Sequence, residues 1–508
     1  MPREVSELLF AQFGNGIELS TQISSTISFF SLSTTSEASV DIEINDSSGH
    51  PMTIELNGQE FIGIVEDLLI APGGIAALET DGTGSLQVGS VRATSDAGIS
   101  GVILFRGFGV AGVGSSNRAR QFRAPMIRGP ALNSGVAIMN METEQSIRAE
   151  LRDEFGSVVA TTDLLLAPNA QIAQFLTEFD WDGSPDLSEF LGTVTMVAPA
   201  DFTATVILVT DDEFATLPVT PLAASDALKG SVVSGSRELY YAPFGDGSDA
   251  STSISSRILL FNVGPDSADA SIEIHDDDGL PMTVELNGDQ VMGSLEDVTI
   301  PSNGVVALAT DGIGALQTGS VVINSNRDIS GVILFDGAGV AGVGSSERLR
   351  SFRAPMRSGP GLNTGIALMN LGNQQVIELD LRNEFGEIVA TASLLIGVNA
   401  HTARFLTEFE WNPPVEFTSF SGTVTANGPE DFAATVILVT QGQFATLPVA
   451  ELASTSAQAA SNLTALPSRF RLQSLTSGVL AFGTLIFFGL CLSLVIRVTT
   501  LPPEGSVK

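Results

Sequence analysis

The sequence predicts an all-β protein: tandem β-sandwich (Ig-like) domains in two copies of about 230 residues, each doubled internally, plus one C-terminal transmembrane helix. Three observations lead to this prediction. Long stretches of the first half of the chain return in the second half at a constant spacing. Short runs that alternate apolar and polar residues are separated by turn residues. An apolar run without a charge lies close to the C-terminus.

The repeat sets the expected domain organisation. MTIELNG at 52–58 returns as MTVELNG at 282–288, and FLTEF at 175–179 returns at 405–409. Within each copy, the order of strands and turns in the first part recurs in the second part in diverged form. We expect four sandwiches that follow one another as an elongated stalk. The expected bounds are 8–115, 116–222, 223–237 (linker), 238–345, 346–452, 453–474 (spacer), 475–496 (membrane helix) and 497–508 (tail).

The strands are predicted from the period-2 pattern. Apolar and charged residues alternate at 376–381, as they do in a strand with one buried face and one solvent face. The apolar segments ATVILVT at 204–210 and 434–440 should be buried on both faces. Turns are expected at Asp-Gly and Asn-Gly pairs, because these residues tolerate the positive φ of tight hairpins. Such pairs include Asp81-Gly82, Asp278-Gly279, Asn287-Gly288 and Asp311-Gly312.

The C-terminal apolar run begins at Leu475, ends at Ile496 and holds 22 residues without a charge. As a helix it would be roughly 33 Å long, enough to cross the apolar core of a bilayer. A buried core helix is the alternative, and we favour the membrane because the run has no polar stripe. Arginines flank both ends, so they do not set the orientation, and the short tail favours an inside C-terminus.

The composition limits the classes of partner and of covalent cross-link that we expect. Acidic residues outnumber basic residues 58 to 23, which gives a formal net charge of −35. Such a surface repels phosphate backbones, so we expect no nucleic-acid partner. The only cysteine, Cys491, lies in the apolar run, which excludes a disulfide within the chain. The first residues, MPREVSELLFAQFG, do not have the pattern of a secretory signal peptide.

Two glycine-rich segments match the dinucleotide-binding pattern GxGxxG: GFGVAG at 107–112 and GAGVAG at 337–342. That pattern binds a pyrophosphate only where a helix begins and offers its N-terminal amides. Pro125 lies shortly after the first segment, and no amphipathic helix of adequate length is expected there. We therefore interpret both segments as connections where backbones of two sandwiches pack closely, at the joint between one unit and the next.

An arginine cluster follows each glycine segment. Its members are Arg118, Arg120 and Arg123 in the first copy, and Arg348, Arg350 and Arg353 in the second. The cluster would suit an anion or a carboxylate of a partner chain. Pairing with local Asp and Glu side chains at the junction between units is the interpretation that we favour.

Acidic loops suggest calcium as the one cofactor to consider, because carboxylate oxygens on a tight loop are ligands for this ion. The candidate ligands are Asp276 and Asp278 before Gly279, and Asp180, Asp182 and Asp186 in another loop. Their spacing is not that of an EF-hand, so ordinary acidic turns are the favoured interpretation.

Catalytic patterns point away from an enzyme. The three histidines stand far apart, and neither GxSxG nor HExxH occurs. A pair of carboxylates, as in a glycosidase, stays open because acids are abundant. Trp181 and Trp411 follow FLTEF on expected loops; each would serve as a ligand platform or, as we favour, as an anchor of its loop.

The repeated motifs, among them PMTVELNG, GVILF, LRxEFG and FLTEF, resemble β-sandwich repeat segments of uncharacterised bacterial secreted and cell-surface proteins. The resemblance covers about 8–450. It implies export, so we expect a start or further repeats upstream of Met1.

We therefore expect a membrane-anchored, acidic, non-catalytic cell-surface protein with a structural or adhesive display role, the repeats lying outside the cell envelope. Its partners would be the membrane, through 475–496, and an extracellular protein or glycan. The alternative is a calcium-dependent or glycan-binding module. A glycosidase and a tail-anchored protein that faces the cytoplasm are the remaining alternatives.

Overall fold

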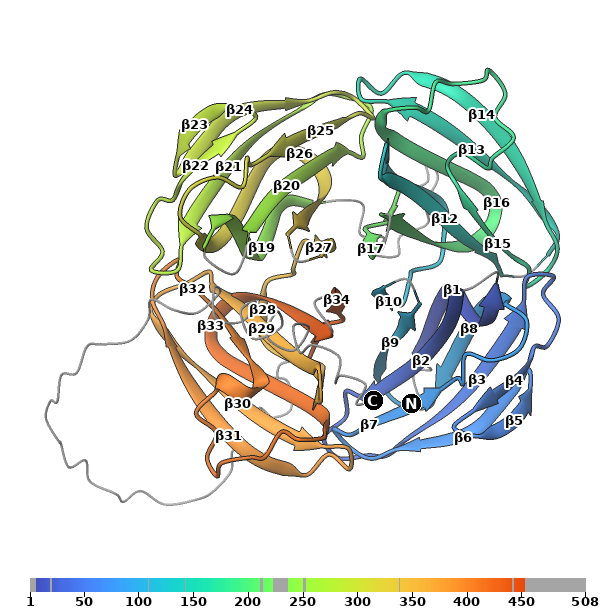
Figure 1. Cartoon of the computed structure of the whole chain (residues 1–508), viewed down its shortest axis with the longest axis horizontal. Coiled ribbons are helices and arrows are strands. Elements are labelled where there is room, and N and C mark those ends of the chain that lie inside the picture. Colours follow the sequence, from blue (N-terminus) through green and yellow to red (C-terminus); the bar gives the residue numbers. More distant parts are fainter. Residues whose placement is uncertain are drawn as a thin grey trace, which may run out of the picture.

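The computed structural model describes residues 6–18, 21–107, 109–141, 143–210, 213–222, 236–249, 253–337, 339–440 and 443–452. Every regular element in these ranges is a strand, apart from one turn of 3₁₀ helix, η1 (Leu406–Glu408). The predicted all-β class is therefore confirmed. The strands form four successive groups, which we name units 1 to 4, around a common centre (Figure 1).

Within the described part of the chain, no helix has the length and apolar character needed to cross a membrane. The predicted membrane segment, Leu475 to Ile496, lies outside the described residues, as do the spacer, the tail and most of the linker between the two copies.

Unit 1 is a β-sandwich. Its two antiparallel sheets have the strand orders β6-β3-β8-β1 and β7-β2-β9-β10, and they join where the ends of β1 and β2 pair. The hairpin β4–β5 lies on the outside of the unit (Figure 1). The strands are β1 (Ser6–Glu18), β2 (Thr21–Ser31), β3 (Ala38–Asp46), β4 (Thr53–Leu56), β5 (Gln59–Ile62), β6 (Ile64–Ile70), β7 (Ile75–Glu79), β8 (Gln87–Ser95), β9 (Ile99–Arg106) and β10 (Val110–Gly114).

Unit 2 has the sheets β14-β13-β16-β11 and β15-β12-β16-β17. The long strand β16 belongs to both sheets, because its first part pairs with β11 and β13 and its second part with β12 and β17. The strands are β11 (Ala119–Gly129), β12 (Leu132–Asn140), β13 (Gln145–Asp153), β14 (Val158–Leu166), β15 (Gln171–Phe175), β16 (Phe190–Val209), β17 (Phe214–Leu217) and β18 (Thr220–Pro221), which pairs with β11.

Unit 3 has the sheets β24-β21-β26-β19 and β25-β20-β26-β27, again with one long strand in both. Its hairpin β22–β23 corresponds to β4–β5 of unit 1. The strands are β19 (Ser236–Ser248), β20 (Ser253–Asn262), β21 (Ala268–Asp276), β22 (Thr283–Leu286), β23 (Asp289–Met292), β24 (Ser294–Ile300), β25 (Val305–Ala309), β26 (Gln317–Asp336) and β27 (Ala341–Gly344).

Unit 4 has the sheets β31-β30-β33-β28 and β32-β29-β33-β34, and β35 pairs with β28. The same order of strands thus recurs in all four units. The strands are β28 (Leu349–Gly359), β29 (Leu362–Asn370), β30 (Gln375–Asn383), β31 (Ile388–Ile396), β32 (His401–Phe405), β33 (Phe420–Thr440), β34 (Gln443–Leu447) and β35 (Ala450–Glu451).

The expected burial patterns are confirmed. In strand β30 buried residues alternate with exposed or half-buried ones, as they do in a strand with one solvent face. The second part of β33 is mostly buried on both faces, because it lies between β29 and β34 in its sheet and Ala433 packs against unit 3. In the hairpin β22–β23, Asn287 and Gly288 have φ of 52° and 91°, which is the conformation that the Asn-Gly pair predicts.

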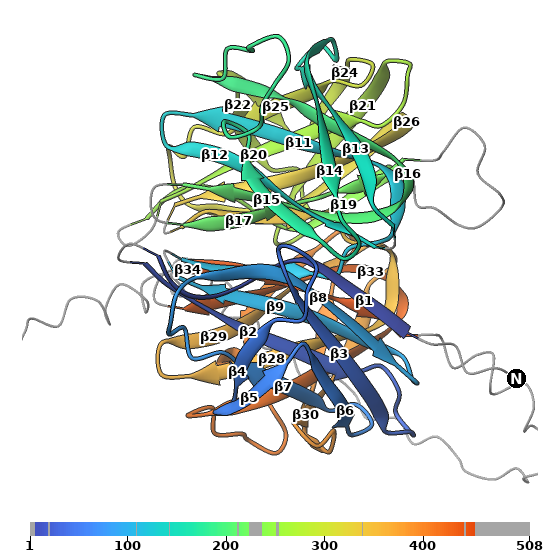
Figure 2. The same cartoon turned by 90° about the vertical axis from the view of Figure 1, so that its right-hand side faces the viewer.

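The units close into a ring, so the expectation of an elongated stalk is wrong. Unit 4 packs against unit 1, where the guanidinium Nη1 of Arg353 donates to the carbonyl of Ser31 at 2.7 Å, across 322 positions of sequence. Each unit therefore touches two neighbours. We call the four contact regions seam 1–2, seam 2–3, seam 3–4 and seam 4–1. Figure 2 views units 1 and 2 from outside the ring.

The four seams are of two kinds. Across seams 2–3 and 4–1 the apolar core is continuous: Val102 and Leu104 of unit 1 belong to the core of unit 4, and Val332 and Leu334 of unit 3 belong to the core of unit 2. Seams 1–2 and 3–4 instead contain small separate clusters. These are Leu9, Ala11, Ala137, Met139 and Met141 in the first, and Tyr240, Ala242, Ala367, Met369 and Ala433 in the second.

Candidate functional site

The centre of the ring is formed by four short strands, β10, β17, β27 and β34, one from each unit (Figure 1). A Cβ atom at Gly112 would overlap the carbonyl oxygen of Thr446, and one at Gly342 would overlap that of Thr216. Only glycine permits these backbones to approach so closely. The two threonine-bearing strands therefore lie directly on the two glycine-bearing strands.

The glycine segments thus contain strands and no helix. The prediction that they mark close packing between sandwiches is confirmed, because Gly112 and Gly342 lie against another unit. They also lie, as predicted, at the junctions between units 1 and 2 and between units 3 and 4, because β10 and β27 come directly before β11 and β28. The unit on which each segment packs, however, is not the one that follows it. Gly112 of unit 1 packs on unit 4, and Gly342 of unit 3 packs back on unit 2, because the ring brings these central strands together.

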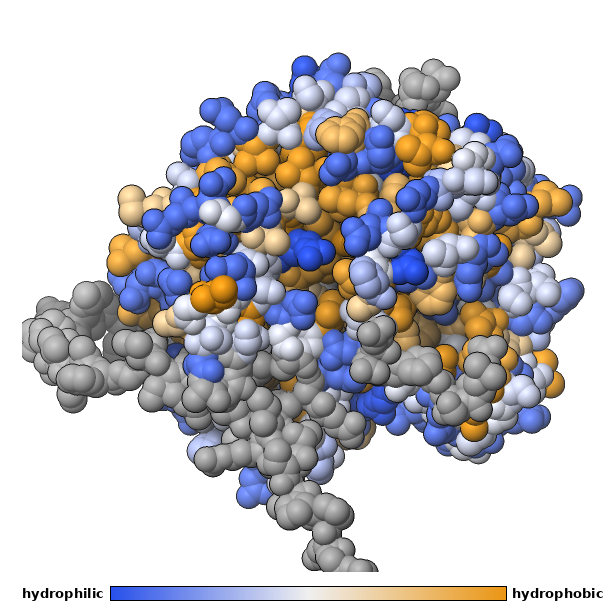
Figure 3. All heavy atoms as spheres, turned by 45° about the horizontal axis from the view of Figure 1, so that its top comes forward, coloured by the Kyte–Doolittle hydropathy of each residue, from blue (hydrophilic) through white to orange (hydrophobic). Residues whose placement is uncertain are grey.

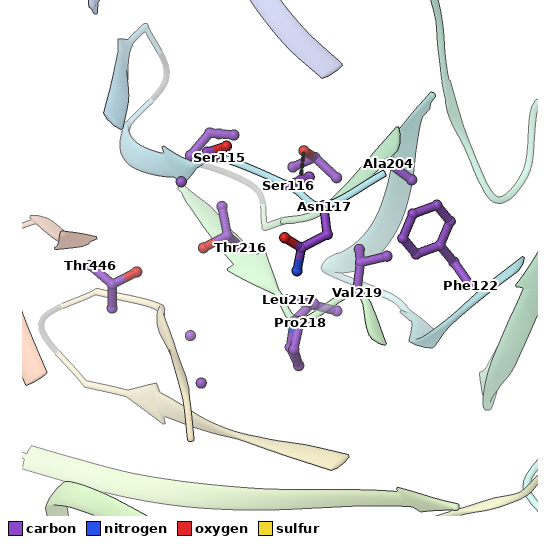
Figure 4. A pocket seen from close by; sticks show the side chains of 15 residues that line it. Ser115, Ser116, Asn117, Phe122, Ala204, Thr216, Leu217, Pro218, Val219 and Thr446 are labelled. Atoms are coloured by element: carbon purple, nitrogen blue, oxygen red, sulfur yellow. Dashed lines mark hydrogen bonds between the residues drawn. The ribbon is translucent and has the colours of Figure 1, made fainter. Parts of the chain in front are cut away.

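A cavity of about 240 Å³ lies beside the central strands of all four units (Figure 4). Its lining combines hydroxyl groups, an amide and glycine backbone with an apolar wall. The lining residues are Val113, Gly114, Ser115, Ser116, Asn117, Phe122, Ala204, Thr205, Thr216, Leu217, Pro218, Val219, Gly342, Gly344 and Thr446.

No charged side chain lines this cavity, although the chain is strongly acidic. The Ser115 hydroxyl accepts a hydrogen bond from the amide of Leu9 at 3.0 Å, and the hydroxyls of Ser116 and Thr205 are 3.3 Å apart. Figure 4 shows the Asn117 amide pointing into the space between Thr216 and the 217–219 segment. The residue that corresponds to Asn117 in the second copy is Glu347, so the two copies differ here in charge.

A carboxylate binds to the second glycine segment. Glu213, immediately before β17, accepts a hydrogen bond from the backbone amide of Val340 and lies against Gly339. The backbone amides of a glycine-rich turn attract anions of any kind, and here the anion belongs to a neighbouring unit. The GxGxxG pattern at 337–342 therefore holds a contact between units.

Four of the six clustered arginines pair with acidic side chains, which confirms the favoured interpretation for them. Arg118 binds Glu7 with two nitrogens, at 2.7 and 2.6 Å, and Arg348 binds Glu238 at 3.0 Å. These two pairs lie in seams 1–2 and 3–4. Arg120 and Arg350 bind Asp201 and Asp431 within their own units.

Arg123 and Arg353 are different, and pairing with a carboxylate is wrong for them. Both are buried, at 3% and 0% exposed. Their Nε atoms donate to Thr195 and Thr425, and their Nη1 atoms donate to carbonyl oxygens across seams 2–3 and 4–1. Burial lowers the pKa of each to about 10, with a further contribution from a neighbouring arginine, so both stay cationic at neutral pH.

We expect acid to weaken seams 1–2 and 3–4, because each seam contains a carboxylate with a lowered pKa. Burial raises the pKa of Glu7, but Arg118 and Arg92 outweigh it, so the pKa lies below its ordinary value of 4.5. The hydrogen bond from Tyr240, together with Arg348, lowers the pKa of Glu238 despite its partial burial. A lowered pKa means that the carboxylate stabilises the folded state above the unfolded pKa, and that this stabilisation is lost as the pH falls through the folded pKa.

We therefore expect Glu7→Gln to lower the melting temperature at about pH 7, and we expect this effect to shrink as the pH falls through the lowered pKa of Glu7. Thermal unfolding of both proteins across this range measures the difference. A difference that stays constant with pH would contradict the role assigned to Glu7. Glu55→Gln, on the exposed hairpin of the same unit, is the control.

The calcium candidates do not come together in the described residues. Asp276 accepts hydrogen bonds from the amides of Asp278 and Leu280 at 3.0 and 2.8 Å, and Asp186 accepts from the amide and hydroxyl of Ser188. Asp180 and Asp182 are exposed. Among the residues described, no group of three or more His, Cys, Asp or Glu side chains is arranged to hold a metal ion. Calcium binding stays a prediction.

The two tryptophans anchor their own loops through a hydrogen bond and a ring contact each. The indole nitrogens of Trp181 and Trp411 donate to the carbonyls of Leu176 and Leu406 at 2.8 Å, and each ring packs on the preceding phenylalanine. Trp411 is 6% exposed, so little of its ring is open to a ligand, and Trp181 is half-buried. Each loop also pairs with an outer edge strand, at Thr161 and Thr391, which covers that edge.

A buried His–Asp contact in seam 3–4 was not predicted. The Nδ1 atom of His401 lies 2.9 Å from a carboxylate oxygen of Asp277, and the His401 amide donates to the Asp277 carbonyl. The imidazole Nε2 is buried without a hydrogen-bond partner in the described part of the chain. In seam 1–2 the matching residue is Gln171, which binds Gln12. His401 and Asp277 are 124 positions apart in the sequence, and they come together because units 3 and 4 pack against each other.

Comparison with known proteins gives no family for this chain: no family model matches it, and no similar curated protein or solved structure was found.

Proposed function

We propose that this chain is a non-catalytic binding head displayed at a bacterial cell envelope, with a structural or adhesive role. The closed ring carries the proposal. Because the apolar core is continuous between units 1 and 4 and between units 2 and 3, and buried clusters fill the other two seams, the outer surfaces of all four units keep fixed positions relative to one another. Fixed, repeated surfaces suit simultaneous weak contacts, whose combined strength exceeds that of each one.

Repeated exposed apolar side chains support an adhesive role. Phe155 and Leu165 of unit 2, and Phe385 and Leu395 of unit 4, occupy matching positions and are 65–72% exposed. Figure 3 shows one face of the molecule, where exposed apolar residues lie between hydrophilic ones. Exposed aromatic and aliphatic side chains that recur with the repeat are typical of contact sites for other proteins.

The anchor in this proposal is the segment from Leu475 to Ile496, as one transmembrane helix with the repeats outside. The acidic composition and the uncharged run of 22 residues support it. We further propose that the four sandwiches are Ig-like repeats of one internally doubled unit, which the common strand order supports. The resemblance to bacterial surface repeats fits both proposals.

Protease treatment of intact cells that express the full chain tests the location. With a tag after residue 508, we expect added protease to release the ring and to leave the tagged tail protected. Protection of the ring until the cells are broken would contradict display and favour a tail-anchored protein that faces the cytoplasm. A cytoplasmic protein that stays intact is the control for cell integrity.

A second candidate function is glycan binding, which the central cavity favours. Its uncharged lining of hydroxyls, one amide and an apolar wall suits a small neutral polyhydroxylated ligand. A glycan array probed with the full chain in detergent tests it, with Asn117→Glu, which copies the residue of the other half, as the matched control. Binding that is equal in both proteins would place the ligand elsewhere.

Calcium is tested by thermal unfolding with and without the ion. If the acidic loops bind calcium, the melting temperature rises at millimolar calcium, because a ligand that binds only the folded state stabilises it. Asp276→Asn should abolish the rise, and magnesium serves as the control cation. No shift at millimolar calcium would end the calcium hypothesis.

A further inference from the structure

Seams 2–3 and 4–1 are built from corresponding atoms. In seam 2–3, Arg123 donates to the carbonyl of Asn262 at 2.8 Å and Thr193 donates to that of Asn303 at 3.1 Å. In seam 4–1, Arg353 and Thr423 make the same bonds. Their acceptors are the carbonyls of Ser31, at 2.7 Å, and Gly73, at 2.8 Å.

The receiving side of each seam consists of main-chain atoms. The acceptors belong to Ser31 and Gly73 in unit 1, and to asparagines at the matching positions of unit 3. The return bond is also main-chain, from the amide of Ile75 to the carbonyl of Glu384, and from Val305 to Glu154 in the other seam. A main-chain acceptor presents the same oxygen whatever its side chain. A donor arginine therefore does not distinguish unit 1 from unit 3.

In both seams, glycines at matching positions allow the main chains of the two units to approach closely. A Cβ atom at Gly156 would overlap the carbonyl of Ser302, and one at Gly386 would overlap that of Pro72. On the opposite sides, Gly304 and Gly74 face the carbonyls of Glu154 and Glu384. The apolar contact repeats as well, since leucines 104 and 334 enter the core of the neighbouring unit.

Each half of the chain therefore carries both sides of the seam: units 1 and 3 provide the receiving side, and units 2 and 4 provide the arginine side. We propose that each half is a self-complementary subunit, and that a second copy of the chain can supply either half of the ring. The proposed interaction surface is the one that is buried in seams 2–3 and 4–1. The proposed partner is the same half of a second copy of the chain. Exchange of an identical element between chains is a common route to dimers. This inference does not depend on the proposed function.

One contact favours the original pairing. In seam 4–1, Arg357 binds Glu79 at 3.0 Å, and the arginine side chain is only 18% exposed. The matching residues of seam 2–3 are Ile127 and Ala309. A ring of two first halves would place Glu79 opposite isoleucine, and a ring of two second halves would place Arg357 opposite alanine. Loss of a partner for a largely buried charge is unfavourable, so the mixed ring should predominate.

The experiment uses the full chain in detergent, with a specific protease site placed within 223–235. Native mass spectrometry should show that the cut halves stay together as one particle. Heavy-isotope and normal proteins are then cut and mixed, and denaturant is raised until heavy–light rings appear after its removal. We expect rings of two first halves and of two second halves beside a larger amount of the mixed ring.

The double variant Glu79→Ala/Arg357→Ile makes the two seams alike at this contact. It should increase the fraction of same-half rings several-fold. The matched control is Asp163→Ala/Arg148→Ile, which removes an exposed pair between β13 and β14 of unit 2 and should leave the fraction unchanged. If heavy–light exchange is complete and same-half rings are absent from both the parent and the Glu79/Arg357 variant, the proposal is wrong. Separation of the cut halves without denaturant would also overturn it.

Discussion

Replacing Leu104 with alanine is expected to destabilise the protein by about 2–5 kcal/mol, the usual cost of truncating a fully buried leucine. Leu104 lies on β9 of unit 1 but is 2% exposed within the core of unit 4. The cavity would therefore weaken two units from opposite ends of the chain. Calorimetry gives the change in unfolding free energy, and hydrogen exchange gives its location.

Loss of amide protection should extend from β9 to β28 and β33 of unit 4. The control is Leu69→Ala in the same unit, because Leu69 is 57% exposed and its truncation should change stability by no more than about 0.5 kcal/mol. Loss of protection that is confined to unit 1 would show that the ring does not close through this core. Equal destabilisation by Leu104→Ala and Leu69→Ala would lead to the same conclusion.

Replacing Gly386 with alanine is expected to open seam 4–1. Gly386 has φ of 77°, which costs a residue with a Cβ atom about 1–2 kcal/mol. The added Cβ would also overlap the carbonyl oxygen of Pro72 in unit 1, so unit 1 must move away. Overpacking of this kind adds about 1–3 kcal/mol.

Gly361 separates the two contributions. It lies in the same unit with φ of 69°, and nothing lies within 4 Å of the position that its Cβ would take. Gly361→Ala therefore measures the conformational cost alone. We expect Gly386→Ala to lower the melting temperature by more than this control, and to expose the amides of β7 to hydrogen exchange. An equal effect of both substitutions would contradict close packing at seam 4–1.

Much of the candidate site followed from residue types and spacing. Arg118 and Arg348 stand in a strongly acidic chain at the expected junction between units, so pairing with local carboxylates could be predicted, and Glu7 and Glu238 are the partners. The glycine segments could be predicted to pack closely, because they lack the helix that phosphate binding needs. The Trp anchors followed from the position of Trp181 and Trp411 after FLTEF, on expected loops of both copies.

The partners across the seams could not be predicted. Arg353 donates to main-chain carbonyls of unit 1, which lie 320 and 322 positions away. Every residue has the same main-chain carbonyl, so the sequence does not show which carbonyl accepts a hydrogen bond from an arginine. An arginine that is buried at a seam therefore looks the same in the sequence as a nearby arginine that binds a carboxylate. The contact between Asp277 and His401 escaped for a related reason, since the matching residues of the other half, Ser47 and Gln171, show no such pair.

The sequence by itself determined the all-β class, the strand pattern and the doubling of the chain. Alternation of apolar and polar residues and Asn-Gly turns act over a few residues, so they can be recognised without knowledge of the rest of the molecule. Only the tertiary structure decided that the four sandwiches close into a ring and do not extend into a stalk. Closure depends on shape and on apolar faces such as that of Leu104, which look in the sequence like ordinary core residues of their own unit.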